Sequence, residues 1–130
     1  MRLFFLGVVL TFGSTSVALA QDCSAPQTQS AMNECAAQFY RFADEDLNLA
    51  YGLARDMAKQ IDTYAPSGQV SSVTLLRDAQ RAWITYRDLA CSAESMLAAG
   101  GSMQPLLHFG CLERLTRTRT EDLRSFGEVN

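Results

Sequence analysis

Apolar residues recur every three or four positions along three long stretches of this chain, and this spacing constrains the fold more than any other feature. Such a spacing places side chains on one face of an α-helix. Breaks at Pro66–Gly68 and at Gly100–Gly101 separate the stretches, and proline and glycine commonly end helices. No segment alternates apolar and polar residues long enough to predict a strand. The sequence therefore predicts an all-α fold, a small antiparallel bundle of three long helices.

The ends of the predicted helices follow from their capping residues. Thr28 is a good N-cap for the first helix. The second helix is expected from about Ser72 to Ala99, with Ser71 or Ser72 as its cap. The third is expected after Ser102 as its cap, with Pro105 tolerated in its first turn. The expected apolar faces are Met32, Ala36, Phe39, Ala43, Leu47, Ala50, Ala54, Met57 and Ile61 on the first helix, Leu76, Ala79, Trp83, Tyr86, Ala90, Ala93 and Leu97 on the second, and Met103, Leu107, Cys111, Leu115, Leu123 and Phe126 on the third.

Residues 1–20 have the order of a secretory signal peptide. A positive start at Arg2 precedes an apolar run, and Ala18 and Ala20 put small residues at the −3 and −1 positions of a cleavage site. The alternative is a retained membrane anchor, but the apolar core has only about half of the ~20 residues that span a bilayer. We expect cleavage after Ala20, a single helical domain over residues 21–130, no membrane span after cleavage, and a location in the periplasm or outside the cell.

The charge of the predicted mature chain is mildly acidic. The full sequence carries −3, and loss of Arg2 with no acidic residue changes this to −4. An acidic exported domain does not suit nucleic acid or an anionic membrane surface. A charge this small does not by itself identify a cationic partner.

All four cysteines lie after the predicted cleavage site, and an even count in a small exported chain predicts two disulfides. If the second and third helices turn near residue 101, Cys91 and Cys111 lie opposite each other. This favours Cys91–Cys111 and leaves Cys23–Cys35, although all four cysteines are expected at one end of the bundle and crossed pairings stay possible. Because a bridge typically adds ~2–4 kcal/mol to a total of ~5–15 kcal/mol, we interpret the cysteines as structural.

The residue types that support catalysis or metal binding are scarce. The sequence has no C-x-x-C pair and a single histidine, His108, which lies between two apolar residues. The carboxylates of Asp44–Asp46 are consecutive on a predicted helix and point in different directions, so they cannot act as neighbours in one site. We expect no metal, no cofactor and no enzymatic activity.

The densest group of polar and aromatic residues lies on the second helix. If the first two helices turn near residue 68, Asn48 faces Arg87 or Asp88 and Tyr51 faces Tyr86. The favoured interpretation is an interhelical polar network that fixes the register, with two aromatic residues in the core. The other is a recognition patch, since Arg, Trp and Tyr are common interface anchors. The predicted network comprises Asp44, Asn48, Tyr51, Gln80, Trp83, Tyr86, Arg87 and Asp88.

Several motifs extend over nearly all of residues 21–130. They are Met32-Asn33-Glu34-Cys35-Ala36, Asp44-Glu45-Asp46-Leu47-Asn48 with Tyr51, Ala79-Gln80-Arg81-Ala82-Trp83 with Arg87-Asp88 and Cys91, Gly100-Gly101-Ser102 before Cys111, and Leu115-Thr116-Arg117-Thr118-Arg119. In these motifs the chain resembles the LprI-type lysozyme-inhibitor family. The resemblance implies a periplasmic or envelope protein that binds and blocks lysozyme. The alternative function is a non-inhibitory, stress-related or protein-interaction module of the envelope.

The inhibitor hypothesis suggests where a partner would bind. C-type lysozyme is strongly basic and uses two carboxylates in a cleft, and an acidic inhibitor gains association rate from the opposite charge. The narrow turn between the second and third helices is the candidate for insertion into that cleft; its other interpretation is a helix–helix turn that needs glycine for its backbone. The candidate partner-binding residues are Gly100, Gly101, Ser102 and Met103, with Arg81 and Arg87 as a second surface.

Overall fold

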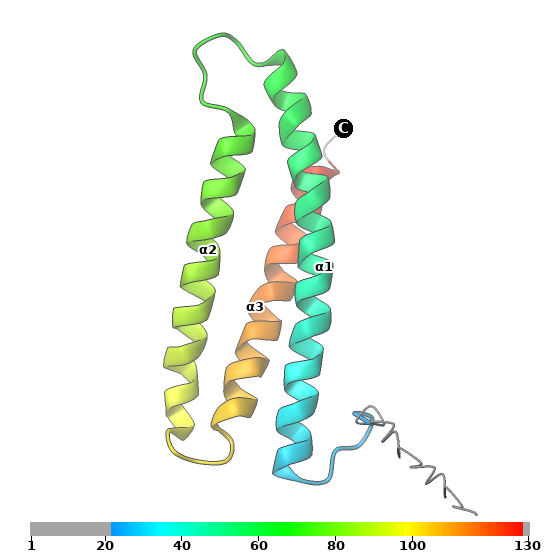
Figure 1. Ribbon diagram of the computed structural model, residues 1–130, viewed down its shortest axis with the longest axis vertical. Coiled ribbons are helices and arrows are strands. Elements are labelled where there is room, and N and C mark those ends of the chain that lie inside the picture. Colours follow the sequence, from blue (N-terminus) through cyan, green and yellow to red (C-terminus); the bar gives the residue numbers. More distant parts are fainter. Residues whose placement is uncertain (1–21, 129–130) are drawn as a thin grey trace, which may run out of the picture.

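The computed structural model describes residues 22–128 and contains three long helices joined by two turns (Figure 1). Helix α1 spans Gln29–Tyr64, α2 spans Ser72–Ser95, a short 3-10 helix η1 spans Met96–Ala98, and α3 spans Gln104–Gly127. The prediction of an all-α bundle of three long helices is confirmed. Consecutive helices are antiparallel, so α1 and α3 run in the same direction (Figure 1). The predicted signal peptide, residues 1–20, lies outside the described residues.

The starts of α1 and α2 are capped by the residues that the sequence indicated. The Thr28 hydroxyl accepts a hydrogen bond from the backbone N–H of Ala31 at 3.1 Å. The Ser71 hydroxyl accepts one from the N–H of Thr74 at 3.3 Å. Each bond satisfies a donor that the first turn of a helix leaves free.

Asp62, near the end of α1, holds the start of α2. Its carboxylate accepts hydrogen bonds from the Ser71 hydroxyl at 2.6 Å and from the backbone N–H groups of Ser72 and Val73. These bonds lower the pKa of Asp62 below its ordinary value because they stabilise the ionised carboxylate, and the bond from Ser71 has the largest effect. The turn between α1 and α2 is therefore closed by one acidic side chain.

The predicted cap of α3 is wrong. The helix begins at Gln104 with Met103 as its N-cap residue, which makes no side-chain capping bond, and Pro105 lies in the first turn as expected. The carbonyl of Ser102 instead accepts a hydrogen bond from the Asn33 side chain at 2.9 Å. The turn is thus tied to the start of α1.

The main packing of the bundle joins α1 to α3 along a row of alanines. Ala43, Ala54 and Ala58 are fully buried, with Leu47 and Ala50 in the same row. Near the end of α3, a Cβ atom on Gly127 would come within 3.3 Å of the Ala54 backbone nitrogen. Small residues permit this close approach. The expected burial of Phe39 and Ile61 is wrong, since both are exposed.

Helix α2 packs mainly against α3 and contacts α1 less (Figure 1). Its buried residues are Gln80, Arg87, Cys91 and Ser95. The predicted apolar face is therefore wrong for this helix: Leu76, Trp83 and Ala90 are half-buried, whereas Ala79, Tyr86, Ala93 and Leu97 are exposed. Helix α2 turns a mostly polar face inward, and two of its buried polar side chains, Gln80 and Arg87, bind partners on the other two helices.

The start of α1 and the turn between α2 and α3 lie at the same end of the bundle (Figure 1), and both disulfides join residues of these regions. Cys91 pairs with Cys111 across that turn, and Cys23 pairs with Cys35 at the start of α1. This is the pairing that the hairpin geometry favoured. Both bridges and the Asn33–Ser102 bond hold the same end of the molecule.

Candidate functional site

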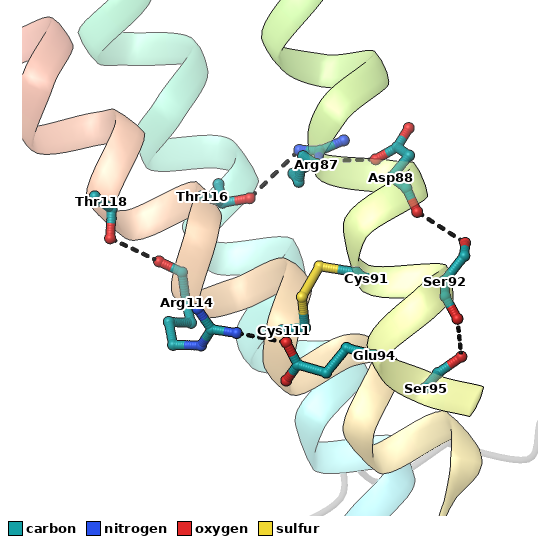
Figure 2. The surroundings of a disulfide bond; sticks show 10 residues. All are labelled: Arg87, Asp88, Cys91, Ser92, Glu94, Ser95, Cys111, Arg114, Thr116 and Thr118. Carbon is teal, nitrogen blue, oxygen red and sulfur yellow. Dashed lines mark hydrogen bonds and ion pairs between the residues drawn. A yellow bond between two sulfur atoms is a disulfide. The ribbon is translucent and has the colours of Figure 1, made fainter. Parts of the chain in front are cut away.

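The buried cation Arg87 organises the contact between the three helices. Figure 2 shows it one turn before Cys91, directed toward Thr116 of α3. Its Nη1 donates to the Thr116 hydroxyl at 3.3 Å and to Asp44 Oδ1 of α1 at 3.3 Å, while its Nε donates to Asp88 at 2.9 Å. One guanidinium group therefore links α1, α2 and α3.

Two aromatic rings enclose the same guanidinium. Its central carbon lies 5.1 Å from the centre of the Trp83 ring and 5.4 Å from that of Tyr40. Both distances are within cation–π range. Burial is the largest influence on Tyr40 and raises the pKa of its phenol above the ordinary value. Arginine suits this position because it remains charged and can stack and donate in a plane at once.

Only part of the polar network predicted from the sequence is correct. Asp44, Trp83, Arg87 and Asp88 meet as proposed, and Gln80 accepts a hydrogen bond from Arg119 of α3 at 3.0 Å. The predicted core position of Tyr86 is wrong, because 61% of this residue is exposed.

The predicted register between α1 and α2 is also displaced by about one helical turn. Asp44, rather than Asn48, contacts Arg87. Asn48 and Tyr51 line the adjoining groove instead of facing Asp88 and Tyr86. The prediction assumed that residues at equal distances from the turn face each other, which requires α1 and α2 to pack directly side by side. In the structure, α2 packs mainly on α3.

Sequence reasoning missed three members of the site: Tyr40, Thr116 and Arg119. Thr116 and Arg119 lie one turn apart on α3, and the buried Thr120 continues that row. The available signal was a row of polar residues at helical spacing on a face of α3 that otherwise points inward. Their partners are on other helices, so spacing alone could not assign them.

A groove of about 480 Å³ separates α1 from α2 next to this network. Arg81, from the second candidate partner-binding surface, is exposed and lines this groove, and no ion pair within residues 22–128 includes its side chain. Arg87 also lines the groove, but its guanidinium is already hydrogen-bonded to side chains within the bundle. The lining residues are Tyr40, Asp44, Leu47, Asn48, Tyr51, Arg77, Gln80, Arg81, Ile84 and Arg87.

The first partner-binding candidate, Gly100–Met103, forms a tightly hydrogen-bonded turn. Gly100 has a φ of 75°, a left-handed conformation that favours glycine. Its N–H donates to the Gln104 side chain at 3.1 Å, and the N–H of Gly101 donates to the Ala98 carbonyl at 2.9 Å. These hydrogen bonds hold the turn in a defined shape.

Exposed apolar side chains surround that turn. Leu97 is 84% exposed, and Met96 and Met103 are exposed beside it. The sequence from Met96 to Leu112 contains no Asp, Glu, Lys or Arg. A neighbouring surface groove of about 610 Å³ is lined partly by Met96, Gly100, Gly101 and His108. We call Met96–Met103 the hairpin tip; it is an uncharged, apolar surface held by nearby disulfides, which suits contact with a protein.

No three His, Cys, Asp or Glu side chains within residues 22–128 are placed to hold a metal ion. His108 is half-buried, with its ring 5.5 Å from that of Phe109 in an edge-on arrangement. None of the helices described in this region is long and apolar enough to cross a membrane.

These features define a small disulfide-bridged three-helix protein that combines an internal arginine network with an exposed apolar tip. The family described as lysozyme inhibitor LprI matches residues 20–123. The chain belongs to this family.

Two relatives and one solved structure resemble the chain. The uncharacterized protein R02472 of Rhizobium meliloti (strain 1021) is 40% identical over 110 residues, covering 82% of this chain and 79% of the relative. The uncharacterized protein YecT of Escherichia coli (strain K12) is 29% identical over 100 residues, covering 73% and 62%. A crystal structure of a DUF1311 family protein from Pseudomonas putida KT2440 matches with a TM-score of 0.66 at 23% identity, covering 81% of this chain and 98% of that one. That structural match supports the fold.

Proposed function

We propose that the protein is exported and that its oxidised domain binds and inhibits a C-type lysozyme without cleaving any substrate itself. Membership of the lysozyme-inhibitor family over residues 20–123 carries this proposal. The two disulfides support it, because such bridges persist in the periplasm and outside the cell. We expect the mature chain to begin at Gln21, which the intact mass of the periplasmic protein tests; a retained N-terminus would contradict processing after Ala20.

The hairpin tip is the surface that we assign to lysozyme. It is narrow, apolar and uncharged, so it can enter a cleft without bringing an unpaired charge out of water. The Cys91–Cys111 bridge and the Asn33–Ser102 bond fix its position relative to the rest of the bundle. A preformed tip loses little conformational entropy when it binds.

The remainder of the domain contributes the electrostatic attraction. The net charge of −4 expected after loss of residues 1–20 attracts a basic lysozyme and raises the association rate. This effect should weaken with salt, since the Debye length falls from ~30 Å at 0.01 M to ~8 Å at 0.15 M. Close apolar contacts survive that screening, so we expect inhibition to weaken with salt and to persist.

The test is lysis of a bacterial suspension by lysozyme in the presence of protein produced from its full coding sequence and purified in the oxidised form. The variant Ser102→Glu with Met103→Glu places two charges on the tip. Gly101 stays unchanged, because a Cβ atom there would lie 3.2 Å from the Ala98 carbonyl oxygen. The matched control, Ser67→Glu with Val70→Glu, adds the same charges to the exposed turn at the opposite end.

The expected result is loss of inhibition in the tip variant and retention in the control, with helicity unchanged in both. Full inhibition by the tip variant would mean that the tip is not the lysozyme-binding surface. The edge of the groove at Arg81 would then be the next candidate, and Arg81→Glu would test it. Absence of inhibition by the unaltered protein would favour the alternative, a non-inhibitory interaction module of the envelope.

A further inference from the structure

The outward face of α2 carries an apolar stripe that has no partner within residues 22–128. Its members are spaced alternately by four and three residues along the helix. Leu75, Leu89 and Met96 are 58%, 67% and 61% exposed. We define the α2 stripe as Leu75, Ala79, Ala82, Tyr86, Leu89, Ala93 and Met96, all of which are exposed; Met96 directly follows α2 as the first residue of η1.

This stripe lies on the opposite side of α2 from the buried residues Gln80, Arg87 and Cys91. A surface helix ordinarily directs its apolar face to the core and its polar face to water. Helix α2 does the reverse over most of its length. Its polar inward face is stabilised by the Arg87 and Gln80 contacts, so the outward apolar residues are not needed to hold the helix on the bundle.

The spacing of the stripe selects the kind of partner. An average step of 3.5 residues keeps contact with a second helix that lies nearly alongside, as in a coiled coil. From Leu75 to Met96 the stripe is about 31 Å long at 1.5 Å per residue. A partner that contacts all of it must itself present a long helix.

We propose that the α2 stripe pairs with the same stripe of a second copy of this chain, antiparallel and related by a two-fold axis near Tyr86. In this register Leu89 of each copy lies over the small Ala82 of the other. The ends match as well, because Leu75 then meets Met96. A parallel pair would place Ala79, Ala82 and Ala93 each against its own copy and leave three thin layers. The antiparallel pair leaves two, where Ala79 meets Ala93, and so loses less packing.

The flanking charges also permit this arrangement. Asp78 borders the stripe on the edge that continues through Thr85 and Ser92. In the antiparallel register Asp78 of one copy lies beside the Ser92 hydroxyl of the other, so two like charges do not face each other. Repulsion of like charges across an interface would otherwise oppose association.

The extent of the surface predicts a weak dimer. A standard stable interface takes about 800 Å² from each partner, and one helix face supplies less. We therefore expect a monomer–dimer equilibrium that depends on concentration.

Sedimentation of the oxidised protein, made from its full coding sequence, between 5 and about 500 µM tests the association. Leu89→Glu should raise the dissociation constant at least ~30-fold, because it buries a charge in the middle of the stripe. Leu49→Glu on α1 is the matched control, since Leu49 is 71% exposed and lies outside the stripe; it should leave the equilibrium unchanged. A monomer at every concentration, or equal dissociation by both variants, would overturn the proposal.

Cross-linking with a short thiol-specific reagent tests the orientation, because the four native cysteines are paired. Tyr86→Cys should link to its own copy, whereas Leu75→Cys alone should not. A mixture of Leu75→Cys and Met96→Cys chains should give the mixed dimer. Self-linking of Leu75→Cys at the rate of Tyr86→Cys would contradict the antiparallel register. These results do not depend on lysozyme inhibition, so failure of one proposal is distinguishable from failure of the other.

Discussion

Replacement of Arg87 tests whether this buried cation stabilises the bundle mainly by packing or by charge. Its side chain is 8% exposed, whereas the carboxylates of Asp44 and Asp88 are 41% and 55% exposed. Water can therefore solvate both carboxylates once the guanidinium is gone. We discount each ion pair to about 0–1 kcal/mol, the range for solvent-exposed pairs.

Larger contributions come from the groups that cannot be rehydrated. Stacking on Trp83 and Tyr40 contributes about 0.5–2 kcal/mol for each ring. The Thr116 hydroxyl is fully buried and loses its donor, at about 1–3 kcal/mol. Because these terms do not add fully, we expect Arg87→Ala to cost about 3–5 kcal/mol in free energy of unfolding.

A variant that restores the side-chain volume separates packing from charge. Arg87→Met keeps an unbranched stem between the two rings but loses the positive charge and the donor to Thr116, so it should cost about 1–2 kcal/mol less than Arg87→Ala, the part that packing of the stem contributes. Urea unfolding followed by helical circular dichroism measures both values, provided that the m-value stays constant. Equal destabilisation by Ala and Met would refute the packing argument and assign the stability to charge. A cost below about 1 kcal/mol for Ala would refute the role of Arg87 altogether.

Three further perturbations have defined outcomes. Trp83→Ala should cost about 2–4 kcal/mol in urea unfolding, below a fully buried tryptophan because Trp83 is half-buried; an unchanged midpoint would make Trp83 a surface anchor. Replacing Cys91 and Cys111 together by serine should cost about 3 kcal/mol for the chain segment that the bridge closes, and a melting temperature equal to that of the parent would contradict this. Asp62→Asn should lower the melting temperature at neutral pH. Because the folded-state pKa of Asp62 is lowered, the difference in melting temperature between parent and variant should be complete above the ordinary carboxylate pKa and should disappear as the pH falls through the folded-state pKa. A difference that does not change with pH would count against the charged cap.

The elements that sequence predicted well are those fixed by local chemistry. Helical spacing and the caps at Thr28 and Ser71 located α1 and α2. The Cys91–Cys111 pairing followed from equal distances to a glycine turn, because a short hairpin leaves little freedom in register. Such features depend on residues close in sequence, so they can be read without the other helices.

The rotation of α2 could not be predicted in the same way. Its apolar residues, Tyr86 among them, suggested an inward face, yet the inward face holds Gln80 and Arg87. Burial of a cation is favourable only when partners on other helices accept its hydrogen bonds. Those partners, Asp44 and Thr116, are far away in sequence. The orientation of the helix therefore depends on contacts that spacing does not contain.

The central claim, inhibition of a C-type lysozyme, is tested most directly by a dose series. The rate of lysis at fixed lysozyme should be measured as folded, oxidised protein is added from below equimolar amounts to a large molar excess, under conditions where neither protein aggregates. We predict a progressive fall in lysis that saturates with increasing protein, with no release of soluble sugar by the protein alone. Undiminished lysis at a large molar excess would contradict the account.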